Sequence, residues 1–236
     1  VCPVCGAPVS RDPDGAAIRC TGAECPAQLL RNLVHFVSRD AMDIDGVGPA
    51  VLQQMIDAEL VRSPADLYDL NPGDVAALER MGKKSAENLM LSVEKSKQND
   101  LSRLLYALGI RQVGVKAGRV LAAHFKTFDA LAAAGAEELT EIPDIGPITA
   151  EFILDWLGNP QSQHMVARLK DAGVNMEYLE KQVNQNFQGM TFVLTGTLTK
   201  FTRQEAGKLV EERGGKAASS VSKKTTYVVA GENAGS

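Results

Sequence analysis

The sequence has few aromatic residues, no long apolar run and only a small net charge. Aromatic side chains make up 5% of the 236 residues, which argues against a stacking platform for single-stranded nucleic acid. No apolar run approaches the ~20 residues of a membrane span, and nothing at the start resembles a secretory signal. The net charge of −4 does not by itself indicate a nucleic-acid-binding protein. We therefore expect a cytoplasmic protein that does not contact a membrane.

Cysteine is absent after residue 25, so all four cysteines lie at the start of the chain: Cys2, Cys5, Cys20 and Cys25. Their C-x2-C and C-x4-C pairs can bring four thiolates to one tetrahedral metal ion. A cytosolic chain keeps its thiols reduced, so we expect a structural zinc site that leaves no open position for water. Two disulfides or a rubredoxin-like iron site are the alternatives. His35 lies beyond this segment in an apolar stretch, and we expect it to pack rather than to bind metal.

Charge is distributed unevenly along the chain. Residues 99–126 carry five basic side chains against Asp100 alone, whereas residues 127–180 carry two basic against ten acidic ones. This alternation fits a protein that holds a phosphate backbone on selected faces, although a solvated mixed surface explains it equally well. The length fits two or three small domains. Because the chain opens almost on a cysteine, without Met, we expect it to be a fragment of a longer protein.

An internal repeat organises the middle of the chain. Its key glycines, separated by 34, 32 and 32 residues, are Gly48, Gly82, Gly114 and Gly146. An aliphatic residue precedes each glycine by four positions, another apolar residue precedes it by one, and a third follows by seven. The flanks have helical periodicity, so each unit predicts a helix, a tight turn and a second helix. The four motifs lie near residues 44–56, 78–90, 110–122 and 142–154.

The repeat glycine is expected to tolerate an unusual φ and to let another backbone come close. The helix that follows begins with unpaired N–H groups and a positive dipole end, which together make a phosphate site. The pattern resembles the helix-hairpin-helix modules that bind DNA. Only the first unit has the full Gly-x-Gly form, and Asp144 weakens the case for direct backbone contact by the fourth. Ordinary αα-hairpins that merely pack together are the alternative.

This resemblance implies contacts to the sugar-phosphate backbone of duplex DNA, without sequence preference. The residues expected to make them are Gly46, Gly48, Gly82, Lys83, Lys84, Arg111, Gly114, Lys116, Arg119 and Gly146.

From residue 189 the pattern changes to strands. We expect strands at 191–196, 217–221 and 226–231 and a helix at 203–213 that Gly214 and Gly215 end. This order resembles the first half of a BRCT domain. Relatives that bind phosphopeptides suggest a phosphate contact at Thr195, Gly196, Lys223 and Lys224, although Thr195 and Gly196 are more simply explained as residues that shape a turn.

Taken together, the chain is expected to be multidomain and mainly α. It comprises a four-cysteine zinc finger at residues 1–28, an all-α tandem helix-hairpin-helix domain at 29–178, a linker at 179–188 and a truncated α/β BRCT domain at 189–236. This order resembles the C-terminal half of bacterial NAD-dependent DNA ligase. Stretches such as 20–28, 35–46 and 81–89 support the resemblance.

The resemblance implies a ligase that seals nicks between a 3′-hydroxyl and a 5′-phosphate in replication and repair. NAD and magnesium would be bound outside this fragment, by the adenylation and OB-type domains on its N-terminal side. The adenylated lysine of the family lies in a Lys-x-Asp-Gly motif, and no such motif occurs here. The fragment would therefore hold no catalytic residue, would not form the enzyme–AMP adduct, and would act as a monomer that clamps nicked duplex DNA near the bacterial nucleoid.

Two other functions remain open at this point. A helix-hairpin-helix subunit of another repair complex would share the middle of the chain, but it would need a carboxylate cluster or a P-loop to be a nuclease or helicase. A non-catalytic protein-interaction scaffold would use the hairpins only for packing and would show no salt-dependent DNA binding.

Overall fold

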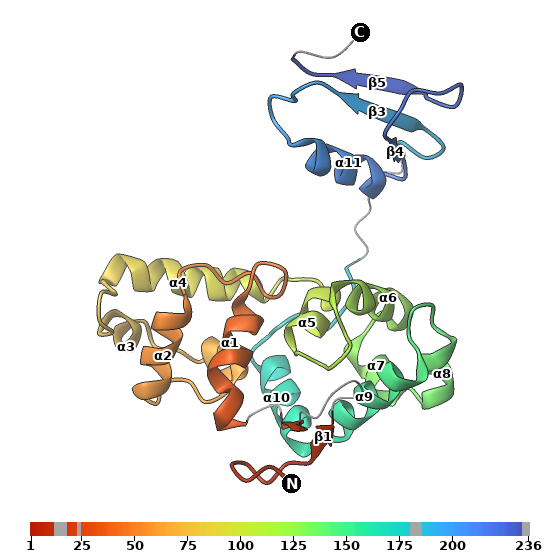
Figure 1. The fold of residues 1–236 in the computed structure, drawn as a ribbon. Helices are drawn as coiled ribbons and strands as arrows, with labels where there is room; N and C mark the ends of the chain where they lie inside the picture. The colour runs from red at the N-terminus through yellow and green to blue at the C-terminus, as the bar shows by residue number, and fades with distance from the viewer. Residues whose placement is uncertain (12–17, 23–24, 180–185, 233–236) are drawn as a thin grey trace. The chain divides into compact units, whose positions relative to one another are not determined.

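The computed structural model describes residues 1–11, 18–22, 25–179 and 186–232. The chain divides into two compact units, Val1–Leu179 and Glu180–Ser236 (Figure 1). No helix in the described part is both long enough and apolar enough to cross a bilayer. The expected linker at 179–188 falls largely on residues 180–185, which lie outside the described residues.

The first unit opens with a small antiparallel ribbon. Strand β1 (Val9–Arg11) pairs with β2 (Ile18–Cys20), and Val9 lies opposite Cys20. A single 3₁₀ turn, η1 (Pro26–Gln28), then leads into the first α-helix. The segment has very little core of its own, so its order depends on the cysteine cluster described below.

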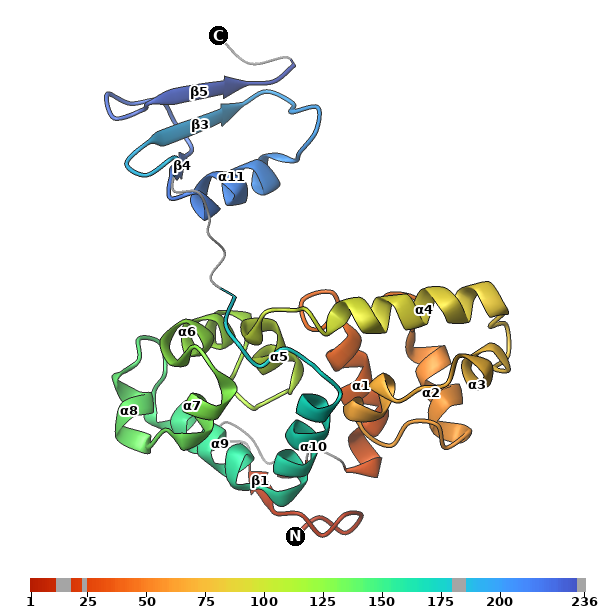
Figure 2. The same ribbon diagram turned by 180° about the vertical axis from the view of Figure 1, so that it is seen from behind.

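Helices then pair as four successive hairpins. They are α1 (Leu29–Val37) with α2 (Pro49–Asp57), α3 (Pro72–Ala76) with α4 (Lys83–Ser96), α5 (Leu101–Ala107) with α6 (Val115–Phe125), and α8 (Ala136–Glu141) with α9 (Pro147–Gly158). Figures 1 and 2 show the first two hairpins on one side of this unit and the last two on the other. The four repeated motifs therefore fold as the periodicity predicts.

Three further elements connect these hairpins. The 3₁₀ helix η2 (Pro64–Tyr68) follows the first hairpin, α7 (Phe128–Ala133) follows the third, and α10 (Pro160–Asp171) follows the fourth. Helix α10 packs against η2, which is about 100 positions earlier in the sequence. This contact joins the end of the array to its beginning.

One continuous apolar core fills the first unit, and the repeat supplies much of it. The position four before the glycine is buried in three units, at Ile44, Ile110 and Ile142, while Leu78 packs against the core from a half-buried site. The residues seven after the glycine are at most 1% exposed in all four units: Met55, Leu89, Leu121 and Ile153. Each hairpin therefore contributes the same positions to the core.

The second unit is a three-stranded parallel sheet with one helix. Strands β3 (Thr191–Thr195), β4 (Lys216–Ala218) and β5 (Tyr227–Ala230) lie in the order β4-β3-β5, and α11 (Arg203–Glu212) is the crossover that parallel pairing requires. Gly214, at φ 80°, follows the end of the helix as expected. The strand expected at 217–221 is shorter, because β4 ends at Ala218 where pairing with β3 stops.

Candidate nucleic-acid interface and metal centre

The four repeat glycines stand at equivalent places, each as the N-cap of the second helix of its hairpin. None of these helix starts receives a side-chain cap, and none has an acidic residue in its first turn. Five other helices, α3, α5, α7, α10 and α11, are capped by Asn71, Asp100, Thr127, Asn159 and Thr202. The uncapped N–H groups and the helix dipole make each hairpin turn a place where an anion is stabilised.

The unusual backbone conformation lies two residues before the expected position. Gly114 has φ −83° and ψ −178°, an extended conformation open to any residue, and the other three N-cap glycines are similar. Positive φ occurs instead at Gly46 (84°), Arg80 (62°), Gln112 (63°) and Asp144 (69°). The expectation that the repeat glycine supplies an unusual φ is therefore wrong, because the chain reverses before it reaches the helix start.

The repeat glycines have no steric reason within the protein to lack a side chain. A Cβ built on Gly48, Gly82, Gly114 or Gly146 meets no atom within 4 Å. Conformation does not require glycine there either, since φ is negative. Glycine is one of the residues favoured at N-caps, and Gly135 begins α8 in the same extended conformation with the same open space. A bare N-cap also lets another molecule come close to the first N–H groups of the helix.

The basic residues expected at this surface differ in exposure and in the groups that they contact. Lys83 and Lys84 are exposed in the first turn of α4, and Arg119 is exposed on α6. Lys116 lies in the first turn of α6, where its Nζ is 2.8 Å from Oδ2 of Asp144, in the turn of the fourth hairpin. The guanidinium of Arg111 lies 4.7 Å from the centre of the Phe152 ring, so it is held by an aromatic contact.

The Lys116–Asp144 ion pair joins the turns of the third and fourth hairpins. The sequence predicts Lys116 as a phosphate ligand and Asp144 as an obstacle to phosphate, without linking the two. A spacing of 28 positions between them carries no local signal, and only the packing of the two hairpins brings them together.

The four cysteines converge on one point, with their Sγ atoms all within 4.8 Å of one another. The Sγ–Sγ distances are 3.9 Å for Cys2–Cys25 and 3.4 Å for Cys5–Cys20, and all four thiols are free. This donor set and geometry fit a structural zinc ion with four thiolate ligands. Gly6 follows the first cysteine pair with φ 72°, a conformation that suits the tight turn at this point.

Local hydrogen bonds and burial act in opposite directions on these thiols. Backbone N–H groups of Cys5 and Val4 lower the pKa of Cys2 to about 6. Burial raises the pKa of Cys20 to about 12 and also raises that of Cys25. Zinc must therefore displace protons from buried thiols, and its binding is expected to weaken as the pH falls.

The second unit does not bring its four candidate phosphate residues together. Thr195 ends β3 and Gly196 follows it at φ 74°. Lys223 and Lys224 precede β5, whose first residue pairs beside Phe192 at the start of β3. Because the strands are parallel, the two pairs of residues lie at opposite ends of the sheet, on the order of 10 Å apart along the strand. A single phosphate contact with all four is not formed.

Comparison with protein families finds matches for four stretches of the chain. Residues 1–27 match the NAD-dependent DNA ligase C4 zinc finger domain, 38–95 the SAM-like helix-hairpin-helix tandem, 103–166 the helix-hairpin-helix motif, and 182–236 the BRCA1 C-terminus (BRCT) domain.

Curated relatives match the whole chain. It is 54% identical over 235 residues to a DNA ligase of Carboxydothermus hydrogenoformans, 50% identical over 236 residues to one of Thermoanaerobacter pseudethanolicus, and 45% identical over 238 residues to one of Clostridioides difficile. Each match covers 100% of this chain but 35% or 36% of the relative. The chain thus spans about a third of the length of the curated relatives that it matches.

Proposed function

We propose that this chain is the part of an NAD-dependent DNA ligase that grips nicked duplex DNA. It matches DNA ligases along its whole length, and its residues 1–27 match the zinc finger domain of NAD-dependent DNA ligases. One observation supports this above all others: four helices begin at bare glycines with uncapped N–H groups and no acidic residue in the first turn. A repeated helix start of this kind suits successive phosphates of a backbone and offers nothing that reads a base edge.

The proposed division of labour follows the domains. The zinc finger at residues 1–28 fixes how the hairpin array meets the preceding domain, and the array at 29–178 holds the duplex. The BRCT segment at 189–236 contributes at most an accessory contact. The whole enzyme would transfer AMP from NAD to a lysine and then to the 5′-phosphate at the nick, with magnesium assisting. Those steps would belong to the adenylation and OB-type domains, since this sequence has no Lys-x-Asp-Gly motif.

In this proposal the chain itself does not self-adenylate. It acts as a monomer in the bacterial cytoplasm, close to the nucleoid. A protein-interaction scaffold is not favoured, because packing alone gives no reason for four bare helix N-termini that face open space. Another repair complex is not favoured either, because relatives that match the whole chain are ligases.

The test is fluorescence anisotropy of the zinc-loaded chain with nicked and intact duplexes of one sequence across a salt series. We expect affinity to fall steeply with salt, since each neutralised phosphate contributes a slope of about −0.9. We also expect tighter binding to the nicked duplex. Failure of the folded chain to bind either duplex at low salt would contradict the proposal.

A matched pair of variants tests the helix starts themselves. Gly114→Asp places a carboxylate at the N-cap of α6, and Gly135→Asp places one at the N-cap of α8, which is the first helix of its hairpin. Both glycines are extended with open space around the Cβ position, and Asp is a favourable N-cap, so both variants should fold. We expect Gly114→Asp to weaken DNA binding about 10- to 100-fold, as loss of a charge-assisted contact implies. Gly135→Asp should bind like the wild type, and equal losses in both would remove the specific role of the hairpin turn.

A further inference from the structure

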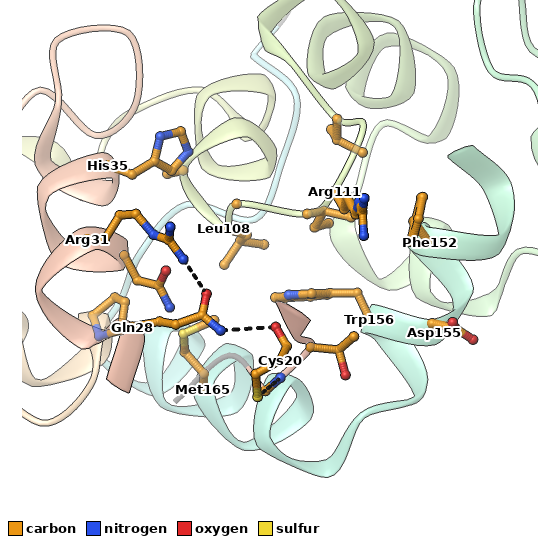
Figure 3. A pocket seen from close by; sticks show the side chains of 18 residues that line it. Cys20, Gln28, Arg31, His35, Leu108, Arg111, Phe152, Asp155, Trp156 and Met165 are labelled. Atoms are coloured by element: carbon orange, nitrogen blue, oxygen red, sulfur yellow. Dashed lines mark hydrogen bonds between the residues drawn. The ribbon is translucent and has the colours of Figure 1, made fainter. Parts of the chain in front are cut away.

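A pocket lies within the first unit where the zinc finger, α1, the third hairpin turn and helices α9 and α10 meet. Its volume is about 610 Å³, within the range of ~300–1,000 Å³ typical of small-molecule sites. Figure 3 shows the lining side chains arranged around a hollow, with α1 on one side and α9 on the other. Neither the hairpin turns nor the zinc cluster explains why a hollow of this size remains between packed elements.

The floor of this pocket is apolar and contains the only tryptophan of the chain. Leu108 and Trp156 are 8% exposed and Met165 is 2% exposed, so they are core residues that also face the hollow. Figure 3 shows the indole of Trp156 directed into the pocket, with its nitrogen at the end nearest the centre. A flat apolar ligand would cover this surface and remove it from water.

The indole N–H of Trp156 has no hydrogen-bond partner in the described part of the chain. Its nitrogen is not among the fully buried unpaired polar atoms of the described residues, which are Nε of Arg103 and Oγ of Ser162, so the donor is open to solvent in the pocket. The site therefore offers one directed hydrogen bond to whatever occupies it.

The described residues of the rim carry charges of both signs, with two arginines at one end. Arg31 donates from Nη2 to Oε1 of Gln28 at 2.7 Å, and Gln28 in turn donates from Nε2 to the Cys20 carbonyl at 3.1 Å, which holds the guanidinium at the edge of the hollow. Arg111 lines the opposite side over Phe152. Asp155 is the acidic residue that faces them, and the Nε2 of His35 is engaged with the Tyr106 carbonyl at 2.7 Å. The two guanidinium groups supply donors for the acidic group of a ligand at their end of the pocket. The zinc-bound thiolates would add negative charge at Cys20, which lines another part of it (Figure 3).

We propose that this pocket binds a small planar aromatic anion. Its ring would lie against Trp156 and Leu108, one of its acceptor atoms would receive the indole N–H, and its negative charge would lie between Arg31 and Arg111. This inference goes beyond the proposed function, because the pocket takes a small molecule and its occupancy requires no DNA.

The test uses the single tryptophan as its own reporter. A ¹⁵N-labelled, zinc-loaded chain gives one indole N–H resonance, which needs no assignment by mutation. The probe is 1-anilinonaphthalene-8-sulfonate, and its control is N-phenyl-1-naphthylamine, the same aromatic body without the sulfonate. We expect the sulfonate to shift the indole resonance saturably and the neutral analogue to bind at least several-fold more weakly. Arg31→Met should raise the dissociation constant of the sulfonate about threefold to tenfold, as loss of a charge-assisted contact at a partly solvated rim implies.

Arg39→Met is the matched control, since Arg39 is an exposed arginine just after the same helix and does not line the pocket. It should leave the titration unchanged. An indole resonance that does not move at millimolar probe would overturn the proposal, whether or not the probe binds elsewhere. Equal shifts with both probes, or equal losses in both arginine variants, would overturn the assignment of an anion. None of these outcomes depends on DNA binding, so the proposal can fail while the proposed function stands.

Discussion

The ion pair between Lys116 and Asp144 predicts that removing one negative charge will tighten DNA binding. The perturbation is Asp144→Asn, which keeps the shape of the side chain. Asp144 has φ 69°, a conformation that Asn adopts as readily as Asp, so the turn should be preserved. Both side chains are largely exposed, at 78% for Lys116 and 51% for Asp144, so loss of the pair should cost at most about 1 kcal/mol of stability.

The magnitude follows from where the carboxylate lies. Asp144 holds the Lys116 ammonium at 2.8 Å, beside the bare helix starts that are proposed to meet phosphates. A phosphate about 6 Å from this carboxylate is repelled by roughly 0.7 kcal/mol in water. Release of Lys116 from an exposed pair adds a few tenths of a kcal/mol. The sum of about 1 kcal/mol corresponds to about fivefold tighter binding at low salt.

The assay is fluorescence anisotropy with a nicked duplex at several salt concentrations, on Asp144→Asn, Lys116→Met and the double variant. Lys116→Met should weaken binding to all sequences alike and make the salt slope shallower by about 0.9. In the Lys116→Met background the gain from Asp144→Asn should shrink to about threefold, because only the repulsion of about 0.7 kcal/mol remains to be removed. Asp171→Asn removes the same charge from the end of α10 and controls for net charge.

Two results would refute this reasoning. If Asp144→Asn binds no more tightly than the wild type at low salt, the fourth turn does not face the phosphates. If the gain increases with salt, it cannot come from a charge within a Debye length of about 8 Å, and the electrostatic account is wrong.

Three further predictions concern the zinc finger and the ion pair between Arg168 and Asp66. Removing zinc with a chelator should unfold the finger and change the fluorescence of Trp156, whose pocket the finger walls, while circular dichroism retains most of the helical signal; an unchanged tryptophan signal would contradict the proposed wall. Gly22→Ala should lower zinc affinity, because the new Cβ would lie 2.5 Å from Oε1 of Gln161 and 3.2 Å from a cysteine sulfur; competition with a chromogenic chelator measures it. Arg168→Met should lower the free energy of unfolding by about 1–3 kcal/mol at neutral pH, because the half-buried Asp66 carboxylate loses its ion-pair partner. The control is Lys170→Met in the exposed pair Lys170–Asp129, which should cost less than about 0.5 kcal/mol. Chemical unfolding at several pH values measures both.

The Arg168 prediction has a definite pH dependence. Burial opposes ionisation of Asp66, but hydrogen bonds from Arg168 and from the N–H groups of Arg62 and Ser63 outweigh it, so the pKa of Asp66 lies below its ordinary value of 3.8. A depressed pKa contributes stability that is fully present above the ordinary value and is lost as the pH falls through the folded-state pKa. The difference between wild type and Arg168→Met should therefore be constant near neutrality and shrink only in acid. A difference that shrinks between pH 7 and 5 would exclude Asp66 as the responsible group.

The parts of the fold that repeat or cluster in sequence could be predicted. The spacing of Gly114 and its equivalents located the helix starts, because the apolar positions around them recur at fixed offsets. The four cysteines located the metal centre, because ligand pairs close in sequence are close in space. The prediction that the repeat glycine has an unusual φ was wrong, because the positive φ lies two residues earlier, at Gln112 and its equivalents. A residue in the left-handed region gives no sequence signal when it is not glycine.

Features that depend on long-range packing could not be predicted. The tie between Arg168 and Asp66 joins residues 102 positions apart, and nothing in either neighbourhood indicates the other. The pocket at Trp156 arises because the finger and four other segments meet without filling the space between them. A hollow of this kind has no sequence pattern, since each of its walls is an ordinary buried face of its own helix.

The left-handed residue in each hairpin turn has a consequence for how such an array can diversify. The φ angle there is positive in all four units, between 62° and 84°, yet the residues are Gly46, Arg80, Gln112 and Asp144. The four equivalent turns therefore carry a neutral, a positive, a neutral and a negative group in chain order. In the proposed interface, substitution at this one place would set the anion affinity of each turn separately. A repeat that keeps a positive φ here thus presents a different charge at each turn, and its two ends would not be equivalent to a bound strand.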